Sequence, residues 1–66
     1  MNIKVELMLL DKRQVDLLLE LNKRDLGYTV NTTDISLSLK GVQRPKYDKI
    51  RADSEVIINE WKAAST

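Results

Sequence analysis

Residues 31–41 have the sequence Asn31-Thr32-Thr33-Asp34-Ile35-Ser36-Leu37-Ser38-Leu39-Lys40-Gly41. This stretch predicts one short helix with a cap at each end. The Asn31 side chain can accept a hydrogen bond from a free amide of the first turn, and Asp34 places negative charge at the positive end of the helix dipole. Gly41 suits the left-handed backbone conformation that often follows a helix. Ile35 and Leu39 are four residues apart, so they are expected to be buried together on one side.

The opposite side of this helix is expected to carry short side chains that combine hydroxyl and methyl groups. They are Thr32, Thr33, Ser36 and Leu37. Such a face lets a helix approach another surface closely, and the major groove of DNA is the obvious candidate because its base edges offer donors, acceptors and thymine methyls. For Thr32 and Thr33 the alternative is ordinary capping, and for Leu37 it is a contact with the last helix or with a protein partner.

The composition excludes several classes of protein. A chain of 66 residues allows a single domain, residues 1–66, and the absence of cysteine and histidine excludes disulfides and the common zinc sites. No histidine or cysteine is available as a base or nucleophile, and no glycine-rich phosphate loop is present. So short a chain also has little room to enclose a small-molecule substrate. The sequence therefore predicts a protein that is not an enzyme and has no cofactor and no metal.

Apolar runs are too short for a membrane protein. The longest near the start is Leu7-Met8-Leu9-Leu10, far below the length of a membrane-spanning helix, and no signal-peptide pattern is visible. A cytoplasmic protein with no membrane contact is expected. Its stability must come from helix packing, from oligomerisation, or from both.

The net charge of +1 conceals an asymmetry along the chain. Residues 31–51 carry five basic and two acidic side chains, a net charge of +3, whereas residues 52–66 carry one basic and three acidic side chains, a net charge of −2. Positive charge therefore gathers beside and after the candidate helix, where contacts with phosphate would need it. The alternative is a basic loop that is merely solvated.

Three further helices are expected around residues 31–41. Residues 2–10 suit either a strand or a helix, and the helix is preferred because Asn2 can cap it and its neighbours are helical. Residues 13–23 are rich in helix formers, and Asp11 is expected to cap them. Pro45 suits the start of a last helix over residues 46–62, and residues 63–66 are expected to be a frayed end.

Two apolar stripes give these helices their buried sides. The first lies in residues 13–23 and consists of Leu17, Leu18 and Leu21. The second keeps to steps of three and four in the last helix and consists of Tyr47, Ile50, Ser54, Ile57 and Trp61. Gly27 marks a turn between the helix expected over residues 13–23 and the helix expected over residues 31–41.

From about residue 3 to residue 61 the chain resembles the lambda-repressor-like, Cro-type helix-turn-helix regulators of phages and other mobile elements. Arg13-Gln14 and the leucines that follow resemble the first helix of the motif, and residues 27–41 resemble the approach to the recognition helix and its body. Three departures stand out. Leu18 replaces a small residue, the link from Leu21 to Thr32 exceeds the compact turn, and Leu37 replaces a long polar or basic base reader.

The resemblance implies an all-α, small four-helix domain containing a helix-turn-helix motif. It also implies a sequence-specific DNA-binding transcriptional regulator, such as a repressor, that binds operator DNA through recognition helix 32–40. Base-edge contacts would come from Thr32, Thr33, Ser36 and Leu37. Phosphate contacts would come from Gln14, Lys40, Gln43, Arg44 and Lys46.

Two half-sites would be needed for useful affinity, so a homodimer on double-stranded DNA is expected. The natural dimer surface is the last helix, with Ile57, Ile58 and Trp61. Two alternatives remain open: a small helical protein-binding modulator of the antirepressor type, which would use Leu37 on a protein partner, and an accessory recombination factor with the same DNA contacts.

Overall fold

Four α-helices make up most of residues 1–65, the part of the chain that the computed structural model describes. They are α1 (Ile3–Leu9), α2 (Gln14–Lys23), α3 (Thr32–Leu39) and α4 (Pro45–Ala64). No strand occurs in this part of the chain, so the all-α fold with four helices is confirmed, including the helix preferred for residues 2–10. None of these helices is both long and apolar enough to cross a membrane.

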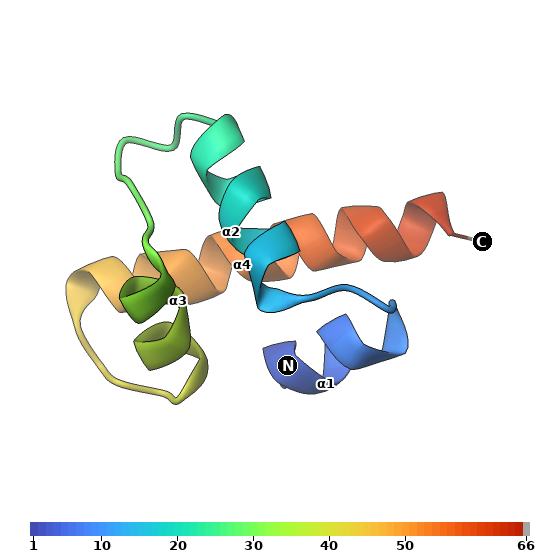
Figure 1. The fold of residues 1–66 in the computed structure, drawn as a ribbon, viewed down its shortest axis with the longest axis horizontal. Helices are drawn as coiled ribbons and strands as arrows, with labels where there is room; N and C mark the ends of the chain where they lie inside the picture. Colours follow the sequence, from blue (N-terminus) through green and yellow to red (C-terminus); the bar gives the residue numbers. More distant parts are fainter. Residues whose placement is uncertain (66) are drawn as a thin grey trace.

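The longest helix, α4, spans the molecule, and the three shorter helices pack around it (Figure 1). It contacts α1, α2 and α3, and α2 also contacts α3. Pro45 occupies its first turn, as expected, where a proline costs no helical hydrogen bond. The helix runs on to Ala64, so the expected frayed end was wrong for residues 63 and 64, while Thr66 lies outside the described residues.

The residue that caps the start of α1 is the predicted one, whereas the start of α2 is capped by a different residue from the one predicted. The Asn2 side chain accepts a hydrogen bond from the Val5 amide at 3.2 Å. At α2 the Asp16 carboxylate accepts one from the Arg13 amide at 2.8 Å, so the expected cap by Asp11 was wrong. Asp11 instead adopts a left-handed conformation, with φ of 56°, in the turn that closes α1. Aspartate tolerates this conformation better than most residues do.

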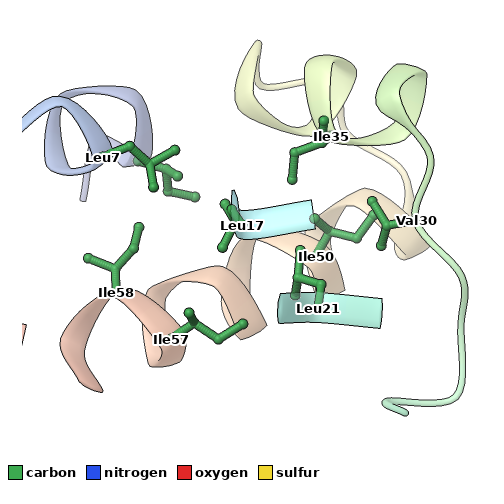
Figure 2. Packing of buried hydrophobic residues seen from close by; sticks show 9 residues of the cluster. Leu7, Leu17, Leu21, Val30, Ile35, Ile50, Ile57 and Ile58 are labelled. Carbon is green, nitrogen blue, oxygen red and sulfur yellow. The ribbon is translucent and has the colours of Figure 1, made fainter. Parts of the chain in front are cut away.

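The core consists of aliphatic side chains from all four helices and from the segment that precedes α3. Each of them is at most 6% exposed, and all except Ile3 are labelled in Figure 2. They are Ile3, Leu7, Leu17, Leu21, Val30, Ile35, Ile50, Ile57 and Ile58. Ile35 and Leu39 both face this core as predicted, Leu39 only in part, and Leu18 packs at its edge.

Two of the expected dimer contacts lie inside the monomer. Ile57 and Ile58 are 1% and 0% exposed, so their assignment to a dimer surface was wrong. These two adjacent residues of α4 are both buried because α4 contacts α1 as well as α2. Ile58 faces Leu7 of α1 (Figure 2). Trp61 is half-buried against the core, and the Lys12 ammonium lies 5.0 Å from the centre of its ring.

Replacing Leu17, which is 0% exposed, by alanine should lower the free energy of unfolding by about 2–5 kcal/mol because it leaves a cavity in the core. Leu19 is the matched control: it lies on the same helix and is 61% exposed, so Leu19→Ala should cost less than about 0.5 kcal/mol. Urea unfolding followed by circular dichroism measures both changes. Equal losses in the two variants would contradict the proposed core.

Candidate nucleic-acid interface

The first turn of α3 is closed by two reciprocal hydrogen bonds. The Asn31 side chain accepts from the Asp34 amide at 2.8 Å, and the Asp34 carboxylate accepts from the Asn31 amide at 3.2 Å. This capping box confirms the predicted roles of both residues at the helix start. At the other end Gly41 has φ of +90°, the left-handed conformation that was expected there. The boundaries of α3 thus follow from its own sequence.

The segment that leads into α3 is held in place by side chains of α2 and α4. Asn22 pairs with the backbone of Val30: its amide donates to the carbonyl and its carbonyl accepts from the N–H, both at 2.8 Å. The Tyr28 hydroxyl donates to the Asp53 carboxylate of α4 at 2.6 Å. Burial and this carboxylate raise the pKa of Tyr28. The long link between α2 and α3 is therefore fixed by hydrogen bonds to both α2 and α4. Asp25 and Gly27 adopt positive φ within it.

Four side chains were expected on the outer face of α3, and they differ in exposure. Thr32 and Thr33 are exposed, whereas Ser36 and Leu37 are half-buried. Within residues 1–65 no side-chain hydrogen bond involves either threonine, and Asn31 supplies the cap. The first turn of α3 thus presents two free hydroxyl groups, and its second turn is more enclosed.

The buried side of α3 includes a serine that the sequence interpretation did not place. Ser38 is fully buried, and its hydroxyl donates to the Asp34 carbonyl at 2.7 Å. Ser54 of α4 is likewise fully buried and donates to the Ile50 carbonyl at 2.6 Å. Because each hydroxyl is satisfied inside its own helix, neither leaves an unpaired polar group in the core.

Four of the five phosphate candidates are exposed and lie in two places. Lys40, Gln43 and Arg44 are exposed on the connection between α3 and α4, and their side chains have no hydrogen-bond or ion-pair partner in the described chain. Gln14 is also exposed, but it lies in a groove beside Lys4 and the end of α1. The structure thus gathers three of the five candidates next to α3 and leaves Gln14 at the start of α2.

Lys46 differs from these candidates because it already has an anionic partner. Its ammonium lies 3.1 Å from the Asp34 carboxylate, an ion pair that joins the first turn of α4 to the first turn of α3. The Asp34 side chain is only 12% exposed. The hydrogen bond from the Asn31 backbone, followed by the Lys46 ammonium, holds the pKa of Asp34 below its usual value.

Arg51 is a residue of this region that sequence reasoning counted only as positive charge. Its Nη1 donates to the carbonyl of Ser38 at 3.0 Å and to that of Val42 at 2.8 Å. Its Nη2 is paired with Asp48. Nothing in the sequence signals these bonds, because the acceptors are backbone atoms 9 and 13 residues away.

Comparison with protein-family models, curated proteins and solved structures found no match to the chain.

The Asp34 carboxylate should stabilise the fold at neutral pH and lose that effect in acid. Since its folded pKa is depressed, its contribution is complete above the unfolded pKa, about 4, and disappears as the pH falls through the folded value. Asp34→Asn should therefore lower the melting temperature clearly at pH 7 and progressively less below about pH 4. The exposed Asp25, which has no side-chain partner in the described residues, supplies the control Asp25→Asn. A difference between wild type and Asp34→Asn that does not vary with pH would contradict this.

Proposed function

We propose that the protein binds duplex DNA with sequence preference and acts as a small transcriptional regulator, with α3 in the major groove. The observation that carries this proposal is the pairing of two features on one short helix. Its first turn exposes Thr32 and Thr33, and the connection after its end exposes Lys40 and Arg44 with no acidic partner in the described chain. Hydroxyls suit base edges and free cations suit phosphates.

In this proposal α2 and α3 form a helix-turn-helix motif, and α4 holds the second helix in place. Contacts between α2 and α3 support it, as does the pinned link between them. Thr32, Thr33 and Ser36 would bond to base edges, and Leu37 would meet a thymine methyl. Lys40, Gln43 and Arg44 would bind the backbone on one side, and Gln14 would bind it at the start of α2.

A homodimer on an inverted repeat is part of the proposal, because one module of this size makes few contacts. With Ile57 and Ile58 in the core, the dimer contact would have to use other apolar side chains. Leu9 is 75% exposed and borders a groove that Trp61 also lines. Sedimentation of the protein with and without its selected DNA tests this part.

One observation favours a second candidate, a protein-binding modulator. Met8 and Leu9 are 71% and 75% exposed at consecutive positions of α1, and a contiguous exposed apolar area is a common feature of protein-binding surfaces. Binding to bulk duplex DNA discriminates between the two functions. A regulator must bind duplexes with an affinity that falls as salt rises, whereas a modulator need not bind them.

Selection of bound sequences from a random duplex pool is the first test, and an enriched inverted repeat is the expected result. Against that sequence, Thr33→Ala should lose roughly 1–3 kcal/mol of binding free energy while binding to scrambled DNA stays almost unchanged. Ser36→Ala should behave in the same way. Neither residue belongs to the buried core, so both changes should leave the fold intact.

Arg44→Ala should weaken binding to every duplex alike and reduce the salt dependence of the affinity by about one released counterion. Circular dichroism of each variant controls for folding. If the threonine and serine variants bind the selected sequence like wild type, α3 is not the base-reading element. If wild type binds no duplex even at low salt, the DNA proposal fails and the modulator takes its place.

A further inference from the structure

Arg51 makes three polar contacts within the protein. From α4 its guanidinium reaches the Ser38 carbonyl, the Val42 carbonyl and the Asp48 carboxylate, and its side chain is only 24% exposed. A guanidinium has five N–H donors in a rigid fork, so these bonds fix its direction. Its charge is therefore committed within the protein, unlike that of Arg44, which has no partner in residues 1–65.

The two carbonyls belong to the end of α3 and to the turn after it. Ser38 lies in the last turn of α3, and its carbonyl accepts from the Gly41 amide at 3.2 Å as well as from Arg51. A cation at this end of the helix is favoured by the helix dipole. Val42 follows Gly41, which reverses the chain direction with φ of +90°. Arg51 thus bonds at once to the end of α3, to the turn and, through Asp48, to its own helix.

The beginning of α3 is attached to the same helix by a different bond. Lys46 of α4 pairs with Asp34 at 3.1 Å, in the first turn of α3. α4 therefore holds α3 by charged groups at both ends. This matters because α3 has only 8 residues, and isolated helices shorter than about 12–15 residues are marginal in water. Its direction is set by what it is attached to.

We propose that Arg51 is a positioning residue for base reading: it fixes the direction of α3 and does not itself bind phosphate. This inference rests on the proposed function for its effect on DNA, but its effect on α3 does not. If it holds, the loss of Arg51 disturbs the reading of bases more than the attraction to phosphates, the reverse of what Arg44→Ala is expected to do.

The experiment compares Arg51→Met, Arg51→Lys and the control Lys49→Met. Lys49 lies two residues away on α4, carries the same charge, and its one described contact is with the Tyr28 ring at 5.8 Å. Amide hydrogen exchange of the DNA-free protein is measured residue by residue. Arg51→Met should speed exchange at residues 38–42 about tenfold more than in the core of α4. Lys49→Met should leave residues 38–42 unchanged, and Arg51→Lys should restore part of the protection.

Affinity for the pool-selected duplex and for a scrambled duplex is then measured across a salt series. Arg51→Met should weaken binding to the selected duplex about tenfold, with scrambled binding and the salt slope as in wild type. A salt slope reduced by about one would overturn the proposal, because it would place Arg51 on a phosphate. Exchange that rises equally at all amides would also overturn it, since Arg51 would then support only global stability. If wild type prefers no DNA sequence, the proposed function fails while the exchange result still decides whether Arg51 orders α3.

Discussion

Contact with α4 is the constraint on which the rest of this structure depends. Each of the three shorter helices packs against it, and its buried residues Ile50, Ile57 and Ile58 contribute to a core shared by all of them. With no cysteine in the chain, the 66 residues hold together without a disulfide, so apolar burial supplies the main stabilising free energy. The polar bonds between helices join elements that already pack against α4.

Those polar bonds decide direction more than stability. Arg24 at the end of α2 bonds to Glu60 of α4 in a two-pronged contact at 2.8 and 3.0 Å, while Lys46 and Arg51 attach α3. Exposed ion pairs of this kind contribute little free energy singly. Here they recur between α4 and its neighbours, and each joins α4 to a particular end of α2 or α3. The two bonds to α3 lie next to the candidate interface.

In the candidate interface, some features follow from the local sequence and others from the packing of the helices. The exposed Thr32 and Thr33 are placed by the capping box, a local device that residues 31–34 contain by themselves. Lys46, by contrast, was grouped with the phosphate candidates because of its charge, and the structure pairs it with Asp34. A charge along the chain indicates where attraction is available, but only the fold shows whether the charge is already used. Lys40 and Arg44 remain available within the described residues.

The sequence by itself determined the four helices and most of their ends. Periodic apolar residues and caps such as Asn2 and Asn31 act within a few residues, so they can be read without a fold. Tertiary structure alone decided that Ile58, which lies outside the predicted stripe of α4, is as buried as Ile57, since α4 is covered by helices distant in sequence. It also decided the role of Arg51, whose acceptors are backbone carbonyls on another helix and its turn. Bonds between separate elements depend on how those elements pack, and no local pattern records that.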